Sequence, residues 1–78
     1  MNRFSPARLR TALAKSGMKQ AELARRMGVS RAALSRILRG LRSPNSRFIA
    51  ALKLGFPDLP LEYFFELDRE EDADTGED

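Results

Sequence analysis

The sequence predicts an all-α fold, a compact domain of five short helices followed by a disordered acidic tail. Apolar residues recur at helical spacing, glycines separate the periodic segments, and no segment has the convincing alternation of a strand. With 78 residues there is room for one domain with a small core, which we assign to residues 1–66. Residues 67–78 are rich in like charges and poor in apolar side chains, which favours disorder.

The first helix is predicted to begin at Ser5-Pro6 and to end at Gly17. Serine is a good helix cap, and proline at the first helical position loses no hydrogen bond because its N–H would be unpaired there anyway. The expected buried face of this helix consists of Leu9, Ala12 and Leu13.

Two short amphipathic helices follow, separated by a glycine. Their apolar residues form two pairs that each lie one helical turn apart, Leu23 with Met27 and Leu34 with Ile37. Gly28 stands between the pairs, where the earlier helix must end. Glycine suits this position because it adopts the left-handed conformation without a Cβ clash.

The turn between these two helices is short, and its residues fit a steep crossing. Val29 is expected to fill the gap between the helices, and Ser30 to cap the second one. Ala24 is small enough to let the helices approach closely. This arrangement is typical of a helix-turn-helix, whose second helix is built to enter the DNA major groove.

The remaining elements are predicted to be brief. Gly40 ends the second motif helix, and the loop after it is marked by Ser43-Pro44-Asn45. A fourth helix is predicted over residues 46–54 and a fifth over residues 60–66. Their expected core side chains are Phe48, Ile49, Leu52, Leu61, Phe64 and Phe65.

Residues 20–39 resemble the helix-turn-helix of the Cro and lambda-repressor-like (XRE-type) regulators of bacteria and their phages. The likeness extends more loosely from about Ser5 to Phe65 and so covers most of the chain. The matching residues are Gln20, Leu23, Ala24, Met27, Gly28, Val29, Ser30, Leu34, Ile37 and the closing Arg39-Gly40.

The resemblance implies which side chains touch DNA bases. Side chains at the start and middle of the second motif helix, over residues 31–39, reach base edges in this family. Arginine suits this task because one guanidinium can bond guanine O6 and N7 together, and a short apolar side chain can contact a thymine methyl. The alternative for each arginine is a phosphate contact or a solvated side chain. The implied base contacts are Arg31, Ala32, Ser35 and Arg36.

The family also uses the first motif helix and the loop after the second to hold DNA phosphates. Here the position before Gln20 is a lysine, which cannot accept a capping hydrogen bond, and Glu22 lacks the partner of a capping box. Either Lys19 serves as a phosphate contact or this helix starts less firmly than in the family. The full expected set is Lys19, Gln20, Ser30, Arg39, Arg42, Ser43, Asn45 and Arg47.

The charges of the chain are strongly segregated. Residues 1–57 carry 13 basic side chains and one acid, a formal charge of +12. Residues 58–78 carry ten acids and one arginine, a formal charge of −9. A basic body of this kind favours a polyanionic partner, and double-stranded DNA is the expected one.

Composition excludes several other functions. The chain has no cysteine and no histidine, which removes disulfides, Cys/His zinc sites, a thiol nucleophile and an imidazole base. We expect a protein that is not an enzyme and needs no metal, cofactor or small-molecule ligand. No apolar stretch approaches the ~20 residues that cross a bilayer, and the N-terminus does not resemble a signal peptide. A cytoplasmic, nucleoid-associated protein without membrane contact is expected.

The leading functional prediction is a transcriptional repressor that binds a near-palindromic operator as a homodimer. Three successive aromatics cannot all face one core, because neighbouring residues on a helix are ~100° apart. Some of them are therefore available for a dimer contact, although a monomer that covers all three is the alternative. The expected dimer residues are Phe56, Leu59, Tyr63 and Phe65.

A second prediction belongs to another class. An antitoxin would use the aromatic C-terminal surface to hold a toxin protein, while its DNA binding would regulate its own operon. The acidic tail is interpreted either as a solvated segment or as a competitor that weakens binding to random DNA.

Overall fold

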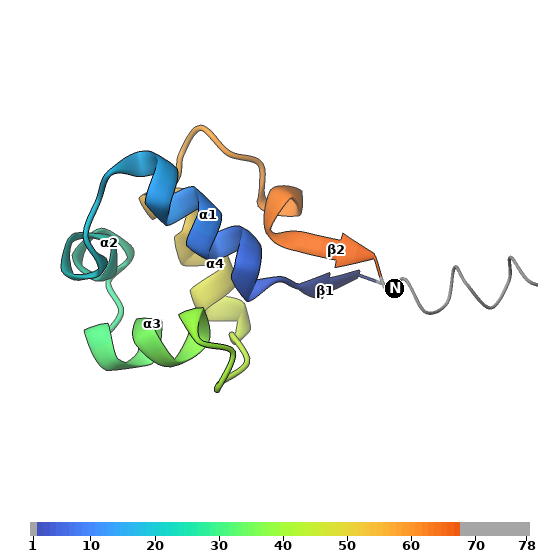
Figure 1. Cartoon of the computed structure of the whole chain (residues 1–78), viewed down its shortest axis with the longest axis horizontal. Helices are drawn as coiled ribbons and strands as arrows, with labels where there is room; N and C mark the ends of the chain where they lie inside the picture. Colours follow the sequence, from blue (N-terminus) through green and yellow to red (C-terminus); the bar gives the residue numbers. More distant parts are fainter. Residues whose placement is uncertain (1, 68–78) are drawn as a thin grey trace, which may run out of the picture.

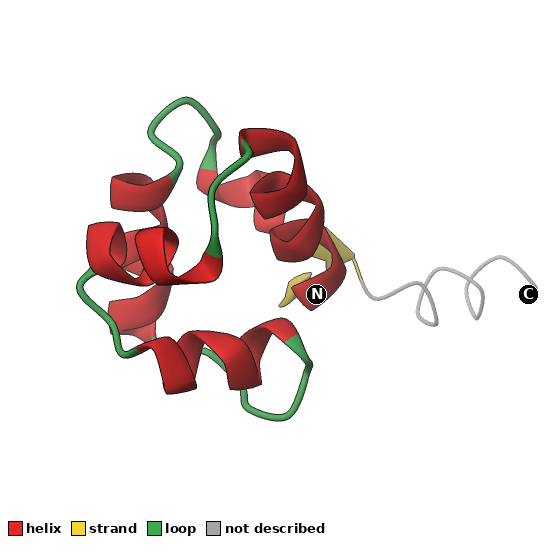
Figure 2. Cartoon of the chain, turned by 60° about the vertical axis from the view of Figure 1, so that its left-hand side comes forward, coloured by secondary structure: helices red, strands yellow, loops and turns green. Residues whose placement is uncertain are grey.

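The computed structural model describes residues 2–67, and this part of the chain is mostly helical. Four α-helices surround one core, and loops run over the outside (Figures 1 and 2). Residues 68–78 of the tail that the sequence predicts to be disordered lie outside the described residues, whereas Leu67, the first residue of that predicted tail, pairs with Asn2. The elements in chain order are β1 (Asn2–Phe4), α1 (Pro6–Ser16), α2 (Gln20–Met27), α3 (Arg31–Leu38), α4 (Ser46–Gly55), the 3-10 helix η1 (Leu61–Phe64) and β2 (Phe65–Leu67).

The predicted ends of α1 are confirmed. The Ser5 hydroxyl oxygen accepts a hydrogen bond from the backbone N–H of Arg8 at 3.2 Å, and Pro6 is the first helical residue. Gly17 follows the helix with φ of 77°, the left-handed conformation that glycine adopts most readily. Helices α2, α3 and α4 also begin and end within one residue of their predicted bounds.

The expected fifth α-helix over residues 60–66 is instead a single turn of 3-10 helix, η1, which has four residues. Phe65 has φ of −121° and ψ of 151°, so the backbone becomes extended where the helix was expected to continue. Phe65 pairs with Phe4 of β1 and its ring packs against the Phe4 ring, and these contacts between distant residues favour the extended backbone.

A two-stranded antiparallel sheet corrects the expectation of an all-α fold. Strands β1 and β2 pair in the register Asn2↔Leu67, Arg3↔Glu66 and Phe4↔Phe65. The Ser5 N–H extends the pairing by donating to the Phe64 carbonyl at 2.8 Å. Each strand has only three residues, which is too short for an alternating pattern to stand out in the sequence.

The core is formed by one or more buried side chains from every helix. Helices α2 and α3 each contribute three buried residues, and the 3-10 helix contributes Phe64, which is fully buried. The Phe64 ring lies 5.7 Å from the Phe56 ring, between their centroids. The largest fully buried side chains are Phe64, Leu9, Leu23, Leu34 and Leu52.

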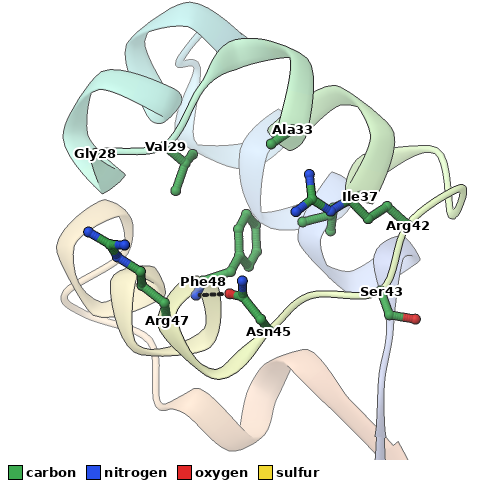
Figure 3. Close-up of a pocket in the computed structure, with 9 residues that line it drawn as sticks. All are labelled: Gly28, Val29, Ala33, Ile37, Arg42, Ser43, Asn45, Arg47 and Phe48. Atoms are coloured by element: carbon green, nitrogen blue, oxygen red, sulfur yellow. Dashed lines mark hydrogen bonds between the residues drawn. The ribbon is translucent and has the colours of Figure 1, made fainter.

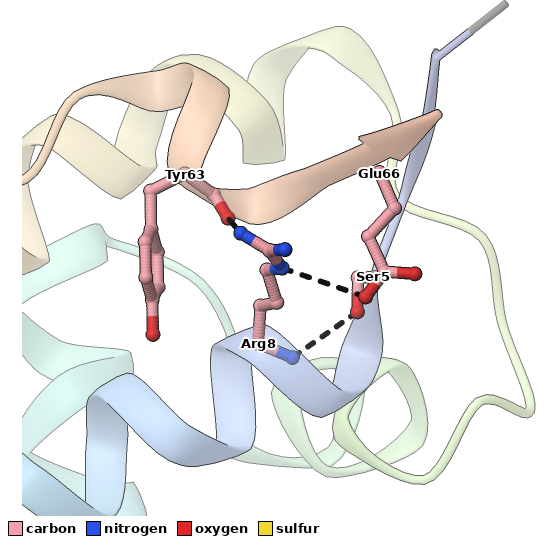
Figure 4. Close-up of polar contacts among 4 residues, drawn as sticks. All are labelled: Ser5, Arg8, Tyr63 and Glu66. Atoms are coloured by element: carbon pink, nitrogen blue, oxygen red, sulfur yellow. Dashed lines mark hydrogen bonds and ion pairs between the residues drawn. The ribbon is translucent and has the colours of Figure 1, made fainter. Parts of the chain in front are cut away.

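Arg8 joins helix α1 to the C-terminal strand (Figure 4). Its Nε lies 3.4 Å from the Glu66 carboxylate, and a terminal nitrogen donates to the Tyr63 carbonyl at 3.2 Å. The guanidinium also lies 5.5 Å from the centroid of the Tyr63 ring. Exposed pairs of this kind are individually weak, so their main role here is to hold the sheet in one orientation against α1.

Gly55 lies at a close contact between α4 and α2. A Cβ atom at this position would lie 2.5 Å from Cδ1 of Leu23 and 3.2 Å from Cγ of Met27. Both of these side chains are buried, so they have little room to move. Only a residue without a side chain allows this contact between the two helices.

We therefore expect Gly55→Ala to destabilise the fold. Overpacking costs about 1–3 kcal/mol and outweighs the gain of up to about 1 kcal/mol from alanine's helix propensity. Urea unfolding followed by circular dichroism measures the change. Lys15→Ala is the control, because Lys15 is exposed on α1 and its replacement should change stability little. A Gly55→Ala protein as stable as the wild type would contradict this packing.

Candidate nucleic-acid interface

Helix α3 has one buried face and one face open to solvent. Leu34, Ile37 and Leu38 are at most 3% exposed. On the other side Arg31, Ala32 and Arg36 are exposed and Ser35 is half-buried. At 100° and 1.5 Å per residue, these four outer positions cover an arc of about 140° and about 7.5 Å of helix length. The four residues that the sequence predicts as base contacts thus share one continuous face.

The turn before α3 fixes the direction of that face. Gly28 is left-handed, with φ of 72°, and the Val29 N–H donates to the Ala24 carbonyl at 3.1 Å. The Ser30 hydroxyl oxygen accepts from the Ala33 N–H at 3.0 Å, which confirms its predicted capping role. Because its oxygen is the acceptor of this cap, the Ser30 hydroxyl still has a hydrogen to donate.

The N-terminus of α2 is open. Lys19 precedes the helix and its side chain makes no capping hydrogen bond, as its chemistry predicts. Glu22 pairs instead with Arg26, at 3.0 Å and one turn along the helix. The first-turn N–H groups around the exposed Gln20 therefore have no carboxylate cap and can meet an anionic group.

A groove separates α3 from the start of α4 (Figure 3). Its volume is about 250 Å³, and it brings together four of the predicted phosphate contacts, Arg42, Ser43, Asn45 and Arg47. In Figure 3, Arg47 extends toward Gly28 and Val29. Two arginines therefore rim a hollow that runs beside the outer face of α3.

Asn45 has a structural role besides its predicted phosphate contact. Its side-chain oxygen accepts from the Phe48 N–H at 2.8 Å and so caps α4. Asparagine directly before a helix that is predicted to begin at residue 46 is a capping signal, although the sequence prediction assigned Asn45 only to phosphate. The Nδ2 amide group remains as a donor that projects into the groove in Figure 3.

Arg39 lies apart from this groove. It follows the last residue of α3 and lines a second pocket, of about 430 Å³, together with Arg3 and Arg10. Arg10 donates a hydrogen bond to the Leu38 carbonyl at the C-terminal end of α3. Arg10 is not among the predicted contacts, because its hydrogen bond joins residues 28 positions apart and leaves no local signal in the sequence.

The four predicted dimer residues differ in exposure. Phe56 is only 6% exposed and belongs to the core of the monomer, while Leu59, Tyr63 and Phe65 are half-buried. Tyr63 packs under Arg8, and the Phe65 ring lies 5.9 Å from that of Phe4. Leu54, which is not among the predicted dimer residues, is 63% exposed near the end of α4.

Two further features of the described residues concern other kinds of site. Between residues 2 and 67, no three His, Cys, Asp or Glu side chains gather in a way that would hold a metal ion. None of the helices in the same part of the chain has the length and apolar character that crossing a bilayer requires.

Comparison with known proteins agrees with this geometry. The model of a helix-turn-helix family matches residues 9–64, a stretch that begins within α1 and ends with η1. No curated protein and no solved structure gives a significant match. A match over most of the chain, together with the capped α2-turn-α3 unit, shows that the chain belongs to the helix-turn-helix family of Cro- and XRE-type DNA-binding transcription regulators.

Proposed function

We propose that this protein is a sequence-specific transcriptional repressor that reads the DNA major groove with the outer face of α3. The observation that carries the proposal is the exposed arc of Arg31, Ala32, Ser35 and Arg36 on a helix whose other face is anchored in the core. A rigidly held helix with outward arginines has the shape and the donors that base reading needs.

Each outer side chain has a role that its chemistry supports. Arg31 and Arg36 donate to guanine O6 and N7, and their separation of about 7.5 Å along the helix spans about two base-pair steps. Ala32 lies between them on the helix surface and presents a methyl group to a thymine methyl. Ser35 is half-buried and adaptable, because its hydroxyl can donate or accept.

Phosphate contacts on both sides of α3 would fix its position in the groove. On one side, Lys19 and Gln20 stand at the open N-terminus of α2. On the other, Arg42, Ser43, Asn45 and Arg47 line the groove beside α4. Such contacts set register and orientation, while the base contacts provide specificity. Ser30 and Arg39 add a contact at each end of α3.

A homodimer on a near-palindromic operator is the proposed assembly. Two copies related by a twofold axis would place two α3 helices about 34 Å apart on one face of the duplex. The exposed side chain of Leu54 and the half-buried side chains of Leu59, Tyr63 and Phe65 offer apolar area for a contact between copies. A dimer bound across a promoter represses by excluding the polymerase.

Selection of bound sequences from a random duplex pool tests the proposal. We expect enrichment of a palindrome whose half-site centres lie one helical turn apart, about 34 Å. A single unpaired half-site would contradict the homodimer but not base reading. No enrichment would contradict sequence-specific binding and would favour a module that works through a protein partner, such as an antitoxin.

The same selection with Arg36→Ala separates base reading from general attraction. Loss of one bidentate contact should weaken binding to the selected site by about 5-fold to 150-fold and relax the preference at one guanine. Lys53→Gln is the matched control, since it removes one positive charge at the far end of α4. Equal losses in both variants would mean that Arg36 contributes only charge.

One substitution can separate the capping role of Asn45 from its proposed phosphate contact. Asn45→Asp keeps the oxygen that caps α4, so the free energy of unfolding should change by less than about 0.5 kcal/mol. The new carboxylate would repel phosphates, and DNA affinity should fall about tenfold in moderate salt. Calorimetric unfolding and a DNA titration measure the two effects. Unchanged DNA affinity would exclude Asn45 from the phosphate contacts.

A further inference from the structure

A second basic surface lies at the base of the two-stranded sheet, away from the groove beside α4. Its pocket of about 430 Å³ is lined by Arg3 from β1, Arg10 from α1 and Arg39 after α3, with Glu66 of β2 at its edge. We call it the sheet pocket. All three arginines are exposed, so their guanidinium groups are accessible to an anionic partner.

The described residues do not neutralise this pocket. Within residues 2–67 the ion pairs are Arg8–Glu66 and Arg26–Glu22. Glu66 thus already faces Arg8, and none of the three pocket arginines forms an ion pair with a described carboxylate. Arg10 uses one terminal nitrogen to hold the Leu38 carbonyl, which leaves its other N–H groups open.

An acidic segment of the same chain is a candidate anionic partner for the sheet pocket. Residues 68–78 contain seven carboxylates and one arginine, and they follow β2 directly. Glu66, two residues before this segment, lines the sheet pocket already. The seven acids are Asp68, Glu70, Glu71, Asp72, Asp74, Glu77 and Asp78.

Residues 68–78 are long enough to reach the sheet pocket. Strand β2 leads away from the helices (Figure 1), so the following residues must turn back to reach the pocket. Three strand residues span about 10 Å, whereas eleven extended residues span about 36 Å. The segment can therefore retrace the strand and still have several acids to place against the arginines.

We propose that residues 68–78 bind in the sheet pocket and compete there with DNA for Arg39. Exposed ion pairs are individually weak, but a short tether raises the local concentration of the segment to about millimolar. The contact is electrostatic and must weaken with salt, since the screening length falls to about 3 Å at 1 M. The docking stands independently of the proposed function, and only the competition rests on it.

A nitroxide label on the full chain tests the docking without DNA. The protein has no cysteine, so Thr75→Cys provides a single attachment site. At low salt we expect paramagnetic broadening of the backbone amide signals of Arg3, Ala7 and Gly40, which surround the sheet pocket. The broadening should disappear in high salt. Broadening limited to the end of the sheet, or spread evenly over the protein, would overturn the docking.

A neutralised segment provides the second test. The variant carries Asp68→Asn, Glu70→Gln, Glu71→Gln and Asp72→Asn, and with the same label it should lose the broadening. Without the label it should bind a random duplex about threefold to tenfold more tightly than the wild type at low salt. Equal affinity in the two proteins would overturn the competition.

A substitution of Arg3 tests the sheet pocket without removing a proposed DNA contact, because Arg3 is not among those contacts. Arg3→Gln should reduce the broadening in the labelled protein, whereas Lys53→Gln, at the far end of α4, should leave it unchanged. Equal broadening in both would overturn the role of the sheet pocket. If the wild type binds no DNA at all, the proposed function fails, while the broadening still decides whether the segment docks.

Discussion

The crossing of α2 and α3 is the constraint on which the rest of the structure depends. Gly28 adopts a left-handed backbone, the Val29 N–H bonds to the Ala24 carbonyl, and Leu23 and Leu34 are completely buried across the turn. Ala24 is 4% exposed at this crossing, where a larger side chain would force the helices apart. Rotating α3 by one residue would turn its outer face by about 100° and could bring the core residue Ile37 to the position of Arg36.

The C-terminal part of the domain packs against the core and stabilises this crossing. Gly55 lets α4 pack against Leu23 and Met27 of α2, and η1 inserts Phe64 into the core. Strand β2 then pairs with β1 and is held by Arg8, so the two ends of the described chain close over the same core. The consequence is that the basic side chains of α3 and of the following loop are displayed on a rigid body.

The helix ends and most of the core could be predicted because they depend on local sequence signals. Caps and left-handed glycines act within one turn of the chain, so Ser5, Gly17, Gly28 and Ser30 indicated the helix ends correctly. Periodic apolar residues likewise identified most of the core. The outer face of α3 followed from the same periodicity, because the residues opposite Leu34 and Ile37 must face solvent.

Contacts between distant residues account for what was missed. Phe4 pairs with Phe65, and Arg10 donates a hydrogen bond to the Leu38 carbonyl. In both cases the two segments are far apart in the chain, and neither has a local sequence signal that identifies its partner. Phe56 was expected at a dimer surface, yet the ring packs against Phe64 inside the monomer. An aromatic residue after a helix looks the same in sequence whether it packs in its own core or contacts a second copy.

Methylation interference tests whether α3 reads bases from the major groove. Dimethyl sulfate methylates guanine N7 in the major groove and adenine N3 in the minor groove, so one reagent compares the two sides. On a duplex selected by the protein, we predict that N7 methylation blocks binding at guanines in two clusters one helical turn apart, while N3 methylation is tolerated. Binding that is insensitive to N7 methylation, or blocked mainly by N3 methylation, would contradict the account.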